Sequence, residues 1–290
     1  MDDPVFDARE TIEAACGARG VELAGAGLWR CGTLDGLARP CVALVGTRAA
    51  TAYGRRLART FAQGLAAAGC CIVSGLALGI DAEAHEGALQ TYAPTIGVLG
   101  SGHRKFFPRR NASLAQRIVD AGGAVLSPYD PDHPAYPSQF LARNGIVAAL
   151  SDAVVVIEAP ARSGALNTAG WAAGRIPVFA VPGDVDRAHV QGCLALIRDG
   201  AILARCPDDV LEALGRAKLL PLPLRPSCAD PDGARLLGAL EAGERALDDL
   251  VAETGVSAPA ALAALALLEL DGAVERRGPT CYASRRCSYD

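Results

Sequence analysis

The chain has 290 residues, of which 51% are hydrophobic, so it can bury one large core and a smaller one. The formal net charge of −4 excludes a uniformly basic nucleic-acid binder, and any contact with DNA has to come from a local patch. The ten cysteines show no C-x-x-C pair, the polar start MDDPVFDARE is unlike a signal peptide, and no apolar stretch has the length of a membrane span. We therefore predict a cytoplasmic protein without a metal site, a cofactor or membrane contact.

Residues 1–40 form a short N-terminal segment with one helix in DARETIEAACGARG, followed by an irregular, Gly-rich stretch. From residue 41, short apolar runs alternate with segments typical of helices, which we expect at 53–68, 80–90, 110–121, 143–150 and 166–174. The apolar runs are CVALVG, CCIVSG, TIGVLG, GAVLS, AVVVIEA and PVFAVPG. Fully apolar strands alternating with helices predict an α/β fold, with a Rossmann-like, doubly wound and mostly parallel sheet over residues 41–218.

The stretch LLPLPLRP breaks this pattern, and its alternating prolines predict a linker over 219–229. Residues 230–284 then contain three helical stretches separated by AGE and TGVS, with a two-stranded ribbon around RRGP. This order predicts a small winged-helix domain. Its presumed recognition helix, 258–270, contains no arginine or lysine, so it is a poor reader of a major groove. We therefore expect this domain to serve in packing or partner contact, with any DNA contact left to the basic residues around and after the ribbon, Arg276, Arg277, Arg285 and Arg286.

Ligands of doubly wound sheets bind where the strands end, so the residues that follow each apolar run are the candidates for a site. Gly46, Thr47 and Arg48 follow the first run and precede a helix, an arrangement that can bind a phosphate. Arg48 could equally be an ordinary surface arginine. Asp81, near the start of the second expected helix, is better explained as a cap than as a catalyst.

The segment after the third run, GSGHRKFFPRRNASL, combines basic and aromatic side chains without an acidic residue. Cations for phosphates and rings for base stacking are what a single strand of nucleic acid requires. The competing interpretation is that Phe106 and Phe107 are buried and that the arginines form a solvated face. Together with the other strand ends, the candidates are Ser74, Gly75, Arg104, Lys105, Arg109, Arg110, Phe140, Arg143, Asn144, Arg162, Ser163 and Gly164.

These residues indicate a site that holds phosphate rather than one that breaks it, because no Ser–His–Asp arrangement and no P-loop lysine accompany them. The motifs VGTRAATAYG, SGLALGIDAEAHEGAL, GVLGSG, FPRRNASL, FLARNGIVAALSDAVVVIEAPARSGALNTA and VFAVPGD, in this order over residues 42–201, resemble the DprA/Smf family of DNA-processing proteins. The resemblance implies a homodimer that binds single-stranded DNA and loads the RecA recombinase during transformation. It also implies a basic DNA-binding pocket that contains Gly46, Thr47 and Arg48.

The chain departs from the family pattern at several positions. Arg143-Asn144-Gly145 stands where the family commonly has Arg-Asn-Arg, so we expect one phosphate contact to be missing. Ser127-Pro128 and HVQGC also differ from the family's usual sequences. The alternative function is a hydrolase of nucleoside monophosphates from the lysine-decarboxylase-like Rossmann group. That group has P-G-G-x-G-T-x-x-E, whereas SGALNTAGWA here lacks both the glycine pair and the glutamate, so a non-enzymatic DNA binder is favoured. A sensor or defence protein that reuses the fold is a third interpretation.

Overall fold

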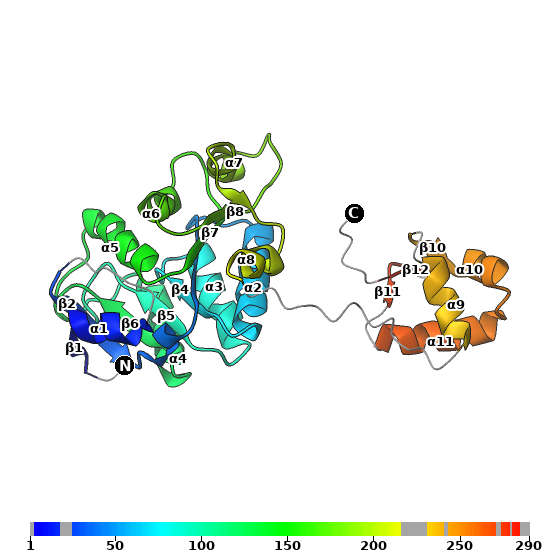
Figure 1. Cartoon of the computed structure of the whole chain (residues 1–290), viewed down its shortest axis with the longest axis horizontal. Coiled ribbons are helices and arrows are strands. Elements are labelled where there is room, and N and C mark those ends of the chain that lie inside the picture. The colour runs from blue at the N-terminus through cyan, green and yellow to red at the C-terminus, as the bar shows by residue number, and fades with distance from the viewer. Residues whose placement is uncertain are drawn as a thin grey trace. The chain divides into compact units, whose positions relative to one another are not determined.

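The computed structural model describes residues 3–17, 25–215, 231–240, 243–270, 274–278 and 280–284. The chain divides into two compact units, Met1–Lys218 and Leu219–Asp290 (Figure 1). The linker predicted over 219–229 lies outside the described residues.

A nine-stranded sheet forms the centre of the first unit, in the order β1-β2-β6-β5-β4-β3-β7-β8-β9. The strands from β6 to β9 in this order run parallel, whereas β1 and β2 are added antiparallel beside β6. The strands are β1 (Val5–Ala8), β2 (Gly27–Gly32), β3 (Cys41–Gly46), β4 (Cys71–Ser74), β5 (Thr95–Val98), β6 (Ala124–Ser127), β7 (Ala153–Glu158), β8 (Val178–Ala180) and β9 (Ile202–Leu203).

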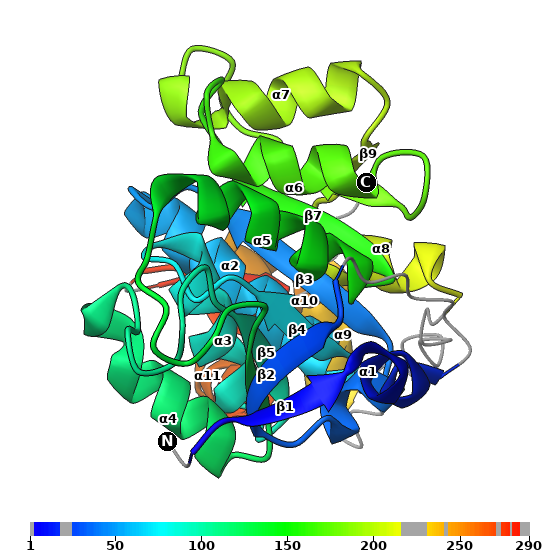
Figure 2. The same cartoon turned by 90° about the vertical axis from the view of Figure 1, so that its left-hand side faces the viewer.

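Helices cover both faces of this sheet, and Figure 2 shows α5 and α6 in front of it. Helices α1, α5, α6 and α7 pack on one face, and α2, α3, α4 and α8 on the other. Their bounds are α1 (Arg9–Ala15), α2 (Ala52–Ala67), α3 (Ile80–Leu89), α4 (Ala112–Asp120), α5 (Pro137–Ala149), α6 (Gly164–Ala172), α7 (Gln191–Arg198) and α8 (Pro207–Ala213), with short 3-10 helices η2 (Asp35–Ala38), η3 (Arg109–Asn111) and η4 (Ala188–Val190).

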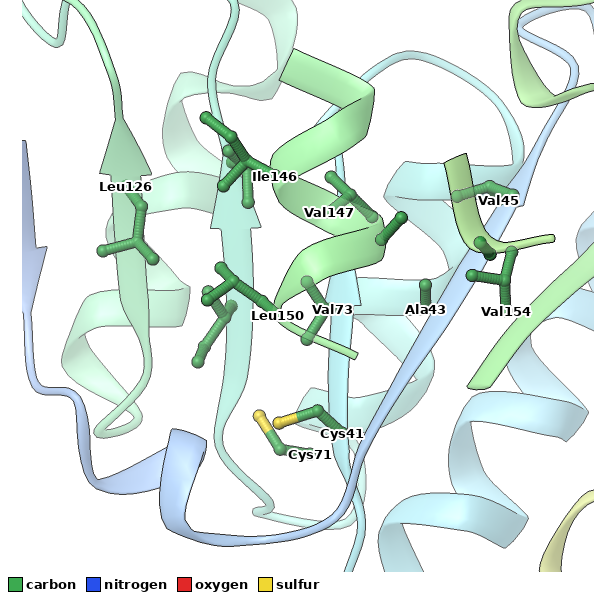
Figure 3. Close-up of a cluster of buried hydrophobic side chains, with 14 of the residues drawn as sticks. Cys41, Ala43, Val45, Cys71, Val73, Leu126, Ile146, Val147, Leu150 and Val154 are labelled. Atoms are coloured by element: carbon green, nitrogen blue, oxygen red, sulfur yellow. The ribbon is translucent and has the colours of Figure 1, made fainter. Parts of the chain in front are cut away.

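The apolar runs are buried on both sides because successive side chains of a strand point to opposite faces. In β3, Ala43 faces the layer of α5 and Val42 faces the layer of α2, and neither side chain is exposed. Figure 3 shows Ile146 and Val147 of α5, and Leu150 directly after this helix, directed toward the sheet. The predicted doubly wound, mostly parallel sheet is therefore confirmed.

Two local expectations need correction. Residues 27–32 are not irregular but form β2, which pairs with β6 nearly a hundred residues later, and such a distant partner leaves no local signal. Helix α5 begins at Pro137 instead of residue 143. Proline at the first helical position is favourable, and the Gln139 side chain accepts a hydrogen bond from the Tyr136 backbone N–H at 2.9 Å. The Pro-rich composition of the preceding loop concealed this start.

Within its described residues, the second unit has three helices and the small sheet β10-β12-β11. The elements are α9 (Pro231–Leu240), β10 (Arg245–Ala246), α10 (Leu247–Thr254), α11 (Ala258–Leu270), β11 (Val274–Arg276) and β12 (Cys281–Ser284). Leu236, Leu250 and Leu265 are fully buried at its core. This is the helix order and ribbon that the sequence predicts for a winged helix.

No single described helix is long and apolar enough to cross a membrane. The pair Leu247–Thr254 and Ala258–Glu269, bent by 111°, passes that test together, by length and composition alone.

Candidate nucleic-acid interface

A cavity of about 310 Å³ lies where the winding of the sheet reverses. Strands β3 and β7 are neighbours, yet the chain leaves β3 toward β4 on one side and continues from β7 toward β8 on the other. The loops that follow β3 and β7 separate at this point and leave a crevice between them. The lining residues are Val45, Gly46, Thr47, Arg48, Ala49, Gly75, Ala77, Asp81, Phe140, Leu141, Arg143, Asn144, Val147, Pro160, Arg162, Ser163, Gly164, Ala165 and Thr168.

Arg48 and Phe140 form the rim on one side of the cavity. The Arg48 guanidinium carbon lies 5.1 Å from the centre of the Phe140 ring, which is within the range of a cation–π contact. The Phe107 ring lies 5.6 Å from the Phe140 ring, and Phe107 is 47% exposed. Arg48 is exposed and forms no ion pair with a carboxylate among the residues that the structure describes. Its charge therefore remains available to a ligand.

Arg143 and Asp81 are buried at the cavity, in contrast to the exposed rim. The Arg143 guanidinium donates from Nη1 to the backbone oxygens of Gly75 and Val98, which fixes its position. Burial lowers the pKa of Arg143 to about 10, and the nearby Asp81 carboxylate opposes this shift. Burial also raises the pKa of Asp81, whose carboxylate accepts from the Gly75 N–H at 3.1 Å. Asp81 thus caps the loop before α3 rather than the helix itself.

Another part of the cavity wall comes from the start of α6 and from α5. The Ser163 hydroxyl oxygen accepts from the Ala165 N–H at 3.3 Å and caps α6. Asn144 of α5 donates to the backbone oxygen of Gly164 at 3.1 Å and so joins the two helices. Arg162 lines the same wall and is exposed. The cavity therefore has an arginine from each of the two loops that separate at the switch point.

The basic segment after β5 borders the cavity but does not line it. Asn111 donates to the backbone oxygens of Leu76 and Ala77, which ties η3 to the loop after β4. Phe106 packs against a buried cluster, as the competing interpretation expected, whereas Phe107 is half exposed. Arg104 pairs with Asp132 at 2.8 Å and with Asp3 at 3.2 Å, so acidic residues from elsewhere in the chain neutralise it.

The cavity brings together ten of the fifteen predicted site residues: Gly46, Thr47, Arg48, Gly75, Phe140, Arg143, Asn144, Arg162, Ser163 and Gly164. Ser74 is fully buried, and its hydroxyl donates to the backbone oxygen of Leu44 at 2.6 Å, which is a role in joining strands. Lys105, Arg109 and Arg110 are exposed on the bordering segment. Asp81 also lines the cavity, although the sequence favoured a cap for it and it was not among the predicted site residues.

Among the described residues, no group of three or more histidine, cysteine, aspartate or glutamate side chains is arranged to hold a metal ion.

Comparison with known proteins agrees with this geometry. A family model for DNA recombination-mediator protein A matches residues 18–215, and one for the DprA winged helix domain matches residues 220–278. A DprA relative from Mycobacterium tuberculosis is 39% identical over 266 residues, which cover 86% of this chain and 66% of the relative. The chain thus spans just under two thirds of that relative's length.

Two solved structures share the fold. DNA processing protein A from Streptococcus pneumoniae is 37% identical with a TM-score of 0.66, and the match covers 73% of this chain and 74% of that one. DNA processing protein A from Helicobacter pylori, described for its single-stranded DNA binding mode, is 31% identical with a TM-score of 0.63. That match covers 73% of this chain and 96% of the other. The chain therefore belongs to the DprA/Smf family of DNA-processing proteins.

Proposed function

We propose that the cavity binds single-stranded DNA, with backbone phosphates at its rim and bases against its aromatic side. The observation that carries this proposal is the rim itself, where the exposed Arg48 lies over Phe140 and Phe107 extends the aromatic surface. Arginine offers a planar fork to phosphate oxygens, and aromatic rings stack on any base. The combination fits an unpaired strand because paired bases present no free faces for stacking.

The chemistry of the buried floor supports the same placement. Asp81 and Arg143 lie there with opposite charges, so the floor offers a phosphate no net positive charge, and we place the phosphates at the rim near the exposed Arg48 and Arg162. The Arg143 Nε is buried and has no hydrogen-bond partner among the described residues. An oxygen of the DNA that reached this atom would satisfy it.

The strand would continue over the segment after β5. Phe107 and η3 border the cavity, and the exposed Lys105, Arg109 and Arg110 have no carboxylate ion pair among the described residues. Arg104 contributes less, since Asp132 and Asp3 already neutralise it.

A gel shift or fluorescence anisotropy titration with labelled oligonucleotides tests this function. Single-stranded DNA should bind more tightly than duplex of the same length. Log affinity should fall with log salt at least as steeply as a slope of about −1.4, which corresponds to two phosphate contacts at about 0.7 each. Preference for duplex, or an affinity independent of salt, would contradict the proposal. Incubation with nucleoside monophosphates should release no base, whereas release would favour the hydrolase.

We further propose that the protein acts without catalysis, as a homodimer that protects incoming DNA and helps to load RecA during transformation or recombination. Membership of the DprA/Smf family supports this role. Light scattering would test the dimer. RecA loading can be tested on single-stranded DNA that is covered by single-strand-binding protein, where the RecA ATPase starts only after a lag. Adding the protein described here should shorten this lag. An unchanged lag would contradict loading.

A further inference from the structure

One residue, Glu158 at the end of β7, holds both ends of the loop that carries Arg48. Its backbone oxygen accepts from the Thr47 N–H at 2.7 Å. Its carboxylate accepts from the Thr51 N–H at 2.9 Å and from the Thr51 hydroxyl at 2.7 Å. Glu158 is only 1% exposed, so these contacts are shielded from water. The loop 47–51 is thus fastened to the neighbouring strand at its first and last residues.

The start of α2 is built to receive this carboxylate. A Cβ atom at Gly54 would lie 2.3 Å from Glu158 Oε2, so a side chain at this position would displace the carboxylate. Thr51 also caps α2, because its hydroxyl oxygen accepts from the Gly54 N–H at 3.0 Å. An anion at a helix N-terminus is favourable, and α2 has 16 residues. His189 adds a further contact, with Nε2 at 3.4 Å from Oε1.

We propose that Glu158 is a positioning residue for DNA binding, which fixes the loop so that Arg48 is held over Phe140 before DNA arrives. This inference rests on the proposed function. A loop ordered by folding does not have to be ordered again on binding, so the affinity rises. The direct effect of the Glu158 charge on DNA has the opposite sign, because a carboxylate repels phosphates. Removing the charge therefore distinguishes the two roles by the direction of the change in affinity.

The test measures single-stranded DNA affinity for Glu158→Gln in the 290-residue chain. Glutamine has nearly the same shape but cannot accept both bonds from Thr51, so we expect affinity to fall about fivefold. Thr51→Val should give a similar loss without any change of charge, whereas Thr51→Ser keeps the hydroxyl and should bind like the wild type. Thr95→Ala is the matched control for stability. It removes a buried hydroxyl that donates to the Ile72 oxygen at 2.7 Å, far from the loop, and should leave the affinity unchanged.

The decisive measurement repeats Glu158→Gln and Thr51→Val in a chain that also carries Arg48→Ala. If both residues act through Arg48, neither should weaken binding further in that background. An equal loss in both backgrounds, or tighter binding by Glu158→Gln, would overturn the inference. If the wild type binds single-stranded DNA and Arg48→Ala weakens it, yet Glu158→Gln binds normally, this inference fails while the proposed function stands. Failure of the wild type to bind would instead refute the proposed function.

Discussion

The cavity of the first unit and helix α11 of the second unit are both places where a DNA-binding protein could contact DNA, and they differ in charge. The cavity has Arg48 and Arg162 exposed on two loops, beside an aromatic surface. Helix α11, in the position of a recognition helix, has no basic residue, and Leu262 and Leu267 are 46% and 60% exposed on it. We therefore propose that the second unit serves in packing or partner contact, with any contact to DNA left to its ribbon.

The comparison also shows why the net charge of −4 misleads. Several arginines of the first unit are already paired with carboxylates, such as Arg59 with Glu83 and Arg117 with Glu86. Arg48 and Arg162 at the cavity form no ion pair within the described part of the chain, and they matter more because a carboxylate next to a cation reduces the net attraction that the cation offers to a phosphate. Local pairing, rather than the total charge, therefore distinguishes the proposed DNA-binding surface from the rest of the first unit.

The largest effect is expected from Arg48→Ala, which should weaken single-stranded DNA binding about tenfold, since a charge-assisted hydrogen bond contributes roughly 1.5–3 kcal/mol. The slope of log affinity against log salt should fall by about 0.7. Arg56→Ala is a matched control, because Arg56 also lies over a ring, 5.2 Å from the centre of Tyr53, but outside the cavity lining. Equal losses of DNA affinity for the two variants would show that the cavity has no special role in DNA binding.

The segment after β5 offers a sharper comparison within one loop. The double change Arg109→Ala and Arg110→Ala should weaken binding about fivefold, because both arginines are exposed and without an ion pair among the described residues. Arg104→Ala should change affinity less than about twofold, since Asp132 and Asp3 already neutralise that side chain. Fluorescence anisotropy at two salt concentrations measures both. A larger loss for Arg104→Ala would show that the strand follows another path.

A smaller change is expected from Gly145→Arg, which restores the arginine that the family commonly has. A Cβ at Gly145 would lie 3.3 Å from the Trp171 ring, so this half-exposed side chain of α6 has to shift. Gly145 also lies outside the cavity lining. We expect a gain in affinity of about two- to threefold, below the tenfold of a full new phosphate contact.

Gly145→Ala introduces the same Trp171 contact without the charge, so the difference in DNA affinity between the two variants isolates the effect of the guanidinium. Thermal melting should accompany both measurements, and a gain for Gly145→Ala alone would contradict a role of charge.

The smallest effect should follow from removing the second unit. A chain that ends at Lys218 should bind single-stranded DNA within about twofold of the whole chain, because α11 offers no cation to phosphates. Circular dichroism and light scattering would establish that the shortened protein is folded and in the same oligomeric state. A loss of binding by a protein that passes both checks would reverse the assignment of roles to the two units.

The sequence was sufficient for the parts of the molecule that depend on local pattern. The runs CVALVG and AVVVIEA are apolar throughout, and both became central strands, because a parallel strand is buried on both faces. Helix α3 begins at Ile80 and α11 begins at Ala258, as expected from their flanking turns. The rule that loops after strands meet at one edge likewise predicted most of the cavity lining.

Tertiary structure decided which charged side chains are paired with a carboxylate and which residues are held in place by residues far away in the sequence. The sequence segment from Arg104 to Arg110 looks uniformly basic, yet only folding brings Asp3 and Asp132 to Arg104. Arg143 is a similar case, since only the fold shows that its guanidinium is buried at the cavity and held by two backbone oxygens. Glu158 is separated from Thr51 by 107 residues, and no local signal joins them. Ion pairing and burial depend on distance in space, whereas the patterns that can be read in a sequence extend over a few residues. The fold could therefore be predicted from the sequence, but the ion pairs and the burial of individual side chains could not.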